Sequence, residues 1–167
     1  IDVSADERFV LLVDGRVVGR GPNRGDICNW SYHTYDIEFP EGVHLVEAVV
    51  WRIGEDAPLA QLSYRGGFIL KADGVFDALL STGKADWEAG ELQGTVPDRK
   101  LPSAGSWGCG SPFRVTGTGF LDEIPTVWKK TAVVRGPVKP NELTRYGYGA
   151  RMPGWRLFPS QLEDQIS

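Results

Sequence analysis

Short runs of apolar residues, separated by turns that contain glycine and proline, recur along most of the chain. Residues 9–13 and 16–19 are two such runs, and the Asp-Gly dipeptide between them favours a tight type I′ turn, so they predict a β-hairpin. Residues 30–35 alternate as expected for a strand with one packed and one partly wet face. Residues 43–51 carry apolar side chains on both faces, which predicts a central strand.

The same spacing continues toward the C-terminus. Further strands are expected at residues 59–64 and 68–72, which form a second hairpin, and at 77–81, 113–115 and 127–134, the last of the series. Residues 21–26 predict an exposed loop, and residues 85–92 form at most one or two helical turns. The pattern therefore predicts an all-β fold, built as a sandwich.

The C-terminal part has a different composition, with prolines and glycines interleaved with aromatic residues. Aromatic side chains at this density pack on something, either the sandwich itself or a neighbouring domain. We therefore divide the chain into a β-sandwich domain at residues 1–135 and an exit segment at residues 136–167. The residues expected to contact a neighbouring domain are Tyr146, Tyr148, Trp155 and Phe158.

Charge and composition exclude several classes of protein. The 18 Lys and Arg face 22 Asp and Glu, a net charge of −4 without like-charged blocks, which argues against binding to duplex nucleic acid. No apolar run approaches the roughly 20 residues of a membrane-spanning helix. The chain begins abruptly at Ile1 without a targeting segment, which predicts a piece cut from a longer polypeptide at its N-terminus. Cys28 and Cys109 have no zinc-site spacing and are expected to be free thiols.

Motifs for catalysis are scarce. Patterns for nucleotide binding, zinc proteases and the GxSxG nucleophile are absent. Asp36 and Glu38 form a carboxylate pair that an autonomous glycosidase would need, although the favoured interpretation is a solvated surface. His33 and His44, the latter placed within a strand, are expected to be structural. The acidic residues near turns are too scattered to predict a metal site.

Aromatic residues stand out from this background. Indole and phenol rings stack on the C–H faces of sugars, while neighbouring polar side chains bond the hydroxyls. Trp30 and Tyr32 beside the polar loop are therefore candidates for a carbohydrate platform, with Arg24 and Asp26 as hydrogen-bonding partners. The alternative, that these rings fill the core, remains open.

Residues 4–22 read Ser-Ala-Asp-Glu-Arg-Phe-Val-Leu-Leu-Val-Asp-Gly-Arg-Val-Val-Gly-Arg-Gly-Pro. This segment resembles the N-terminal β-sandwich of bacterial α-L-rhamnosidases of glycoside hydrolase family 78. The likeness continues through residues 23–26, 30–36, 41–52 and 80–87, and is weaker at 127–129 and 153–159. It thus covers about the first 90 residues well.

The resemblance implies a galactose-binding-like jelly-roll sandwich, upstream of an (α/α)6 barrel that carries the catalytic carboxylates. We therefore expect a non-catalytic accessory domain, with no catalytic residues of its own, that packs on and positions this barrel. The alternative is a carbohydrate-binding module for rhamnose-containing or related plant glycans, and the third interpretation is an autonomous glycosidase. The bacterial compartment (periplasmic, extracellular or cytoplasmic) is left open.

The resemblance also bears on cofactors. Some relatives bind L-rhamnose through calcium, using acidic and amide side chains just after the Val-Gly that follows the hairpin. Arg20 and Gly21 occupy that place here. Because a guanidinium cannot ligate calcium and glycine has no side chain, we expect neither calcium nor any other cofactor.

Overall fold

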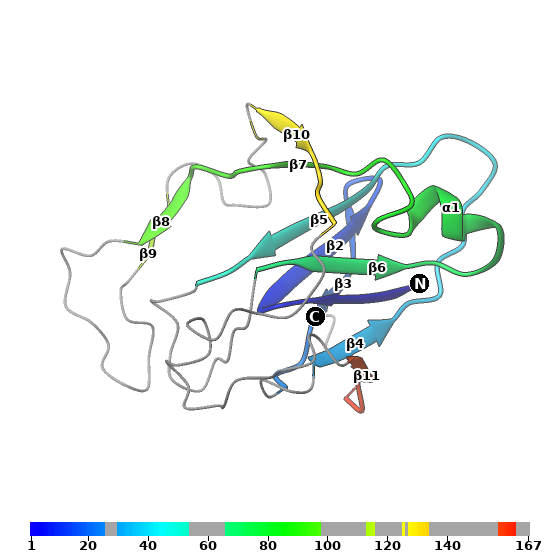
Figure 1. Ribbon diagram of the computed structural model, residues 1–167, viewed down its shortest axis with the longest axis horizontal. Helices are drawn as coiled ribbons and strands as arrows, with labels where there is room; N and C mark the ends of the chain where they lie inside the picture. The colour runs from blue at the N-terminus through cyan, green and yellow to red at the C-terminus, as the bar shows by residue number, and fades with distance from the viewer. Residues whose placement is uncertain are drawn as a thin grey trace.

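The computed structural model describes residues 1–25, 30–53, 66–97, 113–115, 125, 127–133 and 157–162 (Figure 1). The strands are β1 (Asp2–Ala5), β2 (Arg8–Val13), β3 (Arg16–Gly21), β4 (Trp30–Thr34), β5 (Val46–Trp51), β6 (Phe68–Lys71), β7 (Glu88–Gly90), β8 (Thr95–Pro97), β9 (Phe113–Val115), β10 (Trp128–Lys130) and β11 (Leu157–Pro159). A 3-10 turn, η2 (Gly74–Phe76), runs directly into the short helix α1 (Asp77–Leu80). The described residues are therefore mostly β-strands, which confirms the all-β prediction.

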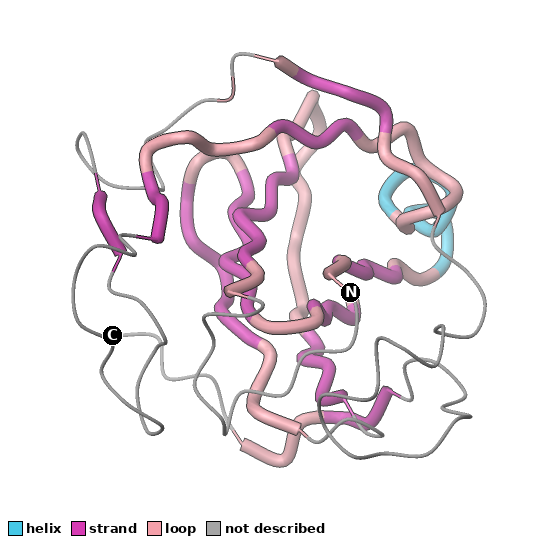
Figure 2. Tube along the Cα trace, turned by 60° about the vertical axis from the view of Figure 1, so that its left-hand side comes forward, coloured by secondary structure: helices cyan, strands magenta, loops and turns pink. Residues whose placement is uncertain are grey.

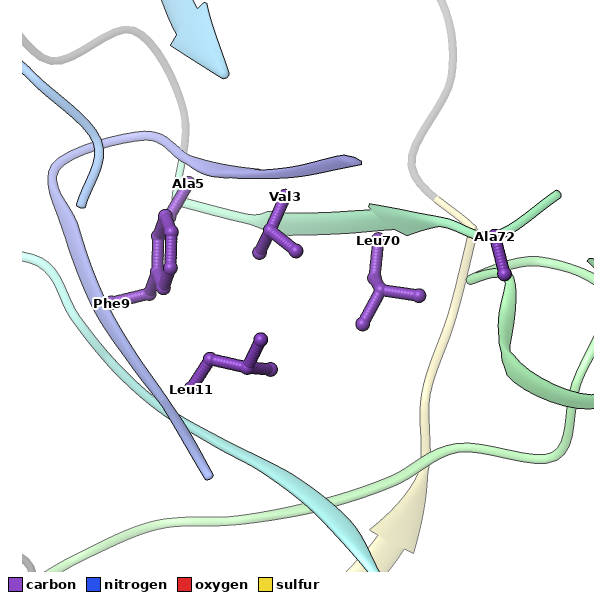
Figure 3. Close-up of a cluster of buried hydrophobic side chains, with 6 residues drawn as sticks. All are labelled: Val3, Ala5, Phe9, Leu11, Leu70 and Ala72. Carbon is purple, nitrogen blue, oxygen red and sulfur yellow. The ribbon is translucent and has the colours of Figure 1, made fainter. Parts of the chain in front are cut away.

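Two sheets enclose the core. One has four strands in the order β11-β4-β1-β6, the other has three in the order β3-β2-β5, and β10-β7 and β8-β9 form separate pairs. The apolar core cluster consists of side chains that are at most 1% exposed, namely Val3, Ala5, Phe9, Leu11, Leu70 and Ala72. Figure 3 shows Val3 and Leu70 approaching Phe9 and Leu11 across the interior. Because β1 and β6 belong to one sheet and β2 to the other, this core holds the two sheets together.

The hairpin predicted around the Asp-Gly dipeptide is confirmed. Asp14 and Gly15 adopt φ values of 50° and 74°, the positive pair that a type I′ turn requires. Leu11 pairs with Gly19 but Leu12 pairs with Val17, so β3 contains one extra residue and bulges there. β2 pairs with both β3 and β5 and is therefore the central strand of this sheet.

The prediction for residues 43–51 is wrong in two respects. The strand begins only at Val46, and β5 pairs only with β2, at the edge of the sheet as the described residues define it. Leu45 instead exchanges backbone contacts with the hairpin turn, since the Asp14 amide donates to the Leu45 carbonyl oxygen at 2.9 Å. Val43 is fully exposed. Apolar residues of a turn were thus counted as one face of a strand.

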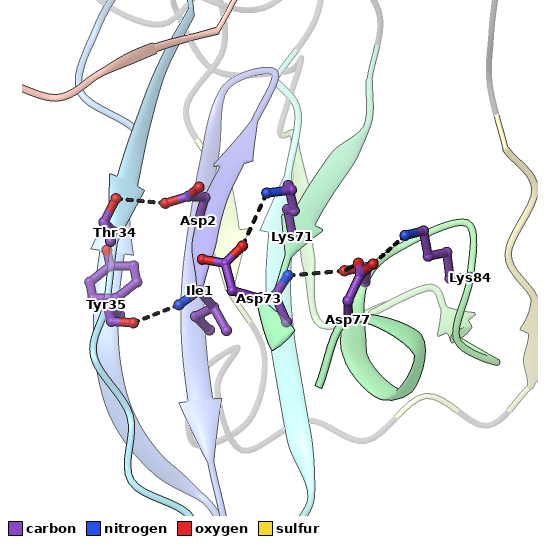
Figure 4. A network of polar contacts seen from close by, with 10 residues as sticks. Ile1, Asp2, Thr34, Tyr35, Lys71, Asp73, Asp77 and Lys84 are labelled. Atoms are coloured by element: carbon purple, nitrogen blue, oxygen red, sulfur yellow. Dashed lines mark hydrogen bonds and ion pairs between the residues drawn. The ribbon is translucent and has the colours of Figure 1, made fainter. Parts of the chain in front are cut away.

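Residues 77–81, predicted as a strand, form α1 and its C-terminal cap. Gly74, at φ 59°, turns the chain after β6, and the Ala-Leu-Leu run that follows has no β-branched residue to oppose a helix. The Ser81 hydroxyl donates to Asp77 Oδ1 at 2.6 Å. The Lys84 ammonium pairs with the same carboxylate (Figure 4). These two contacts, the Lys84 hydrogen bond foremost, hold the pKa of Asp77 below its ordinary value.

The outer edge of β6 is closed by the segment that follows this helix (Figures 1 and 2). The Thr82 amide donates to the Leu70 carbonyl oxygen at 2.9 Å, and Thr82 Oγ1 accepts the Leu70 amide at 3.2 Å. Ser81 Oγ accepts the Ala72 amide at 3.0 Å. Backbone groups that a neighbouring strand would otherwise bond are therefore satisfied by two hydroxyl-bearing residues.

Tyr35 connects the end of the first sheet to β3. Its amide donates to the Ile1 carbonyl oxygen, and the Ile1 amino group donates to the Tyr35 carbonyl oxygen, both at 2.8 Å (Figure 4). The phenol donates to the Arg20 carbonyl oxygen at 3.3 Å. A Cβ atom built on Gly19 would lie 2.2 Å from the Tyr35 ring, so the ring occupies the space that this glycine leaves free.

Three other segments can be compared with their sequence predictions. Residues 85–92, where the sequence allowed at most one or two helical turns, contain the strand β7, which pairs with β10. The strand predicted at 127–134 is confirmed over β10, but it is not the last, because β11 follows. The strand at 113–115 is confirmed as β9, whereas residues 59–64 lie outside the described residues. No helix in the described part of the chain is long and apolar enough to span a membrane.

Candidate functional site

Trp30, the first candidate for sugar stacking, lies in the interior. Its side chain is 4% exposed, and Nε1–H donates to the Asp6 carbonyl oxygen at 3.2 Å. Tyr32, two residues along β4, is partly exposed. Stacking requires an open ring face. In this structure Trp30 therefore offers no such face, and Tyr32 is the more accessible of the two rings.

Arg24 lies in the loop after β3. This loop was predicted to be exposed, and the structure shows that only part of it is exposed. Pro22 is buried, whereas Arg24 and Gly25 are exposed. Asn23 fixes the loop, since its amide donates to His33 Nε2 at 3.1 Å and its Nδ2 donates to Ser160 Oγ at 2.6 Å. Asp26 lies outside the described residues.

The C-terminal segment packs on the sandwich itself through β11. Leu157, Phe158 and Pro159 pair in parallel with β4, and the Ser160 amide donates to the Tyr32 carbonyl oxygen at 2.7 Å. Phe158, predicted to contact a neighbouring domain, is 42% exposed on this strand. The other three predicted contacts, Tyr146, Tyr148 and Trp155, lie outside the described residues.

The positions that the resemblance compares with a calcium site lie at the end of a strand here. Arg20 and Gly21 belong to β3, and a Cβ built on Gly21 would lie 2.9 Å from the Phe9 ring and 3.0 Å from His33. Gly21 therefore packs against the core. Among the described residues, no group of three or more His, Cys, Asp or Glu side chains is arranged to hold a metal ion.

The carboxylates considered for glycosidase chemistry are surface groups. Asp36 and Glu38 are both exposed and follow β4 instead of lying within a strand. His33 is 5% exposed and accepts a hydrogen bond at Nε2, which fits its predicted structural role.

A buried acidic corner between β1 and β2 was not singled out from the sequence. Asp6 and Glu7 are 3% and 1% exposed. Asp6 Oδ2 lies 3.7 Å from Arg52 Nε, and Glu7 Oε2 accepts the Ile53 amide at 2.5 Å. These contacts join the corner to the end of β5 and indicate a structural role. The only sequence signal is two acids placed directly between apolar runs.

His44 forms a polar contact at the opposite, turn end of the hairpin. It precedes β5, which corrects its predicted place within a strand. Nδ1 lies 2.8 Å from Asp14 Oδ2, and Nε2 lies 2.8 Å from the Pro40 carbonyl oxygen. Both neighbours are acceptors, so the ring satisfies both only when both nitrogens are protonated. The Asp14 hydrogen bond, and then that to Pro40, raise the pKa of His44, while His44 and the Leu45 amide lower the pKa of Asp14.

We expect this contact to make stability depend on pH in two windows. The His44 contribution is fully present below its unfolded pKa of about 6.5 and is lost as the pH rises through its raised folded pKa. The Asp14 contribution is present above its unfolded pKa of about 3.9 and is lost as the pH falls through its lowered folded pKa. An NMR titration of His44, with unfolding midpoints of the wild type and His44→Gln across pH, measures this. Titration of His44 at or below about pH 6.5 would contradict it.

Several apolar side chains are exposed on two neighbouring segments, the turn before β5 and η2–α1. The segments touch through Phe39, whose ring centroid lies 5.6 Å from that of Phe76 and 5.4 Å from that of His44. We call these side chains the loop–helix patch; its members are Val43, Leu45, Val75, Phe76 and Leu79. This patch was not predicted from the sequence. A usable signal is an apolar residue directly after a turn glycine, as at Val43 and Val75, because the turn keeps it out of the core.

Comparisons with known proteins add no relative to this description. No family model, no curated protein and no solved structure matches the chain.

Proposed function

We propose that this chain is a non-catalytic accessory domain of an α-L-rhamnosidase-like glycoside hydrolase, with a jelly-roll sandwich of the galactose-binding type that packs on the catalytic barrel. The observation that carries the proposal is the loop–helix patch. Soluble monomers rarely leave large contiguous apolar areas exposed, and such areas mark surfaces for another protein or domain. Val43, Val75 and Leu79 are 100%, 81% and 68% exposed although each is strongly apolar.

Two further observations support this proposal. The first is the resemblance of residues 4–22 and the segments after them to the accessory sandwich of these enzymes. The second is β11, because its parallel pairing with β4 fixes Leu157–Pro159 of the exit segment on the sandwich. A segment fixed in this way helps an accessory domain to position a neighbour.

The proposal can be tested by placing charged residues in the loop–helix patch and measuring the stability of the barrel. In the polypeptide that carries this chain together with the barrel, Val75→Asp with Leu79→Asp is expected to lower the barrel's unfolding temperature by at least about 2 °C. Val127→Asp, at a site that is also 61% exposed but outside the patch, is the matched control and should leave the barrel unchanged. In the 167-residue chain alone, both variants should unfold within about 0.5 kcal/mol of the wild type.

Two outcomes would overturn the proposal. One is a patch variant that leaves the barrel's unfolding temperature unchanged. The other is turnover of an aryl α-L-rhamnoside by this chain alone that Asp36→Asn abolishes, which would support the autonomous glycosidase instead.

A second candidate is a carbohydrate-binding module. Arg24 favours it, because this guanidinium is exposed and makes no hydrogen bond or ion pair with the rest of the described chain. The module would have to use Arg24 and Tyr32 without Trp30, since the indole is buried.

A further inference from the structure

Two arginines belong to the open end of the β2–β3 hairpin, and the Pro22 carbonyl oxygen that Arg8 bonds lies two residues before Arg24. Arg8, at the start of β2, is partly buried, and its Nη1 donates to the Glu7 carbonyl oxygen at 2.8 Å and to the Pro22 carbonyl oxygen at 3.3 Å. Its Nε and Nη2 make no hydrogen bond or ion pair within the described part of the chain. Arg24 follows Pro22 by two residues, on the same loop. Five N–H donors of a guanidinium are rarely left unused in a partly buried position.

The local charge favours an anion. Burial lowers the pKa of Arg8, the positive charge of Arg24 lowers it further, and the Glu7 carboxylate raises it. No ion pair joins Arg8 or Arg24 to a described carboxylate. Of the charged groups that act on the Arg8 pKa, one is the Arg24 guanidinium and one is the Glu7 carboxylate, so together with Arg8 this set carries one net positive charge, which one ligand carboxylate would neutralise.

Asn23, the residue directly before Arg24, is held in place by two hydrogen bonds. The Asn23 amide donates to the buried His33 ring, and the Asn23 side chain donates to Ser160 on the segment after β11. The residue directly before Arg24 is thus fixed to β4 and to the C-terminal segment. Because Asn23 is already fixed, less conformational entropy is lost when Arg24 is ordered by a ligand.

We propose that Arg8 and Arg24 form a binding site for a carboxylate, and that the ligand is an acidic saccharide containing uronate. The planar guanidinium fork binds carboxylates through paired hydrogen bonds, which a neutral sugar hydroxyl cannot match in strength. The chain has a net charge of −4, so general attraction of polyanions is weak and binding must come from this local pair. That the ligand is a saccharide rests on the second proposed function, the carbohydrate-binding module. That the ligand carries a carboxylate is argued from Arg8 and Arg24 alone.

The test is calorimetric titration of the 167-residue chain with a galacturonate trimer and with its methyl ester, which has the same sugar rings but no charge. We expect the acid to bind at least about tenfold more tightly than the ester, which corresponds to the loss of one charged hydrogen-bonded contact. Arg24→Gln should weaken binding of the acid about tenfold and weaken binding of the ester by a smaller factor. Arg16→Gln, an exposed arginine at the turn end of the same hairpin, is the matched control and should change neither.

A second variant guards against misfolding. Arg8→Lys keeps the positive charge but removes the guanidinium fork. It should therefore weaken binding of the galacturonate trimer, while its melting curve shows that the chain is folded. Equal binding of acid and ester would overturn the anion site but leave the carbohydrate-binding candidate standing. Absence of binding by either, in a folded chain, would overturn both. Binding of inorganic phosphate as tight as that of the galacturonate trimer would overturn the saccharide part of the proposal.

Discussion

Replacing Trp30 with alanine is expected to lower the free energy of unfolding by about 3–5 kcal/mol, because a buried indole is removed from the interior. Its side chain is 4% exposed, and its N–H satisfies the Asp6 carbonyl oxygen. Loss of the ring leaves a cavity, and loss of the N–H leaves a buried acceptor without that donor. Chemical denaturation of the purified chain measures the change.

Two companion variants make the Trp30 result interpretable. Trp30→Phe keeps most of the ring but loses the N–H, so it should cost about 1–3 kcal/mol. Tyr32→Ala, on the same strand but partly exposed, should cost less than Trp30→Ala. A Trp30→Ala chain as stable as the wild type that had lost sugar binding would show that the indole is a binding platform after all.

Gly19→Ala is expected to destabilise the fold by about 1–3 kcal/mol, since overpacking forces rigid neighbours to move. The added Cβ would lie 2.2 Å from the Tyr35 ring, a separation that no relaxed contact allows. The ring has little freedom to yield, because its phenol bonds the Arg20 carbonyl oxygen and its backbone pairs with Ile1. Unfolding midpoints of the two proteins give the cost.

The cause can be isolated with a double-mutant cycle. In a Tyr35→Ala background the same Gly19→Ala change should cost less than about 0.5 kcal/mol, because the clashing ring is gone. Gly66→Ala is a matched control, since a Cβ there meets only the flexible Arg52 side chain at 2.9 Å. An equal cost of Gly19→Ala in both backgrounds would assign the effect to the β3 backbone instead of to the ring.

The elements that the sequence predicted well are those specified by neighbouring residues. The β2–β3 hairpin depends on an Asp-Gly turn and two adjacent apolar runs, all within about a dozen positions. The α1 turn was missed for a related reason, because a four-residue Asp-Ala-Leu-Leu segment is too short to show a helical period. The Gly74 turn before it and the Ser81 and Lys84 contacts to Asp77, which support the helix, do not show in an apolar pattern.

Long-range pairing could not be predicted in the same way. β11 joins β4 from more than a hundred residues away, and nothing in Leu157-Phe158-Pro159 specifies a parallel partner. The candidate sugar platform depended on the same kind of information. Trp30 and Tyr32 alternate alike in sequence, yet only Trp30 is covered, because burial depends on which distant segment packs over each ring. Arg24 was named from the sequence, whereas Arg8 emerged only from its hydrogen bond to the Pro22 carbonyl oxygen, two residues before Arg24.

The closed edge of β6 has a consequence for how the molecule behaves at high concentration. An open strand edge is a template on which another chain can add, and this is a common route to aggregation. At Leu70 and Ala72 the backbone groups that face away from β1 are already bonded by Thr82 and Ser81, which lie on a turn after α1. At these two residues the border of the four-stranded sheet is thereby shielded from strand addition without a charged residue or a proline in the centre of β6.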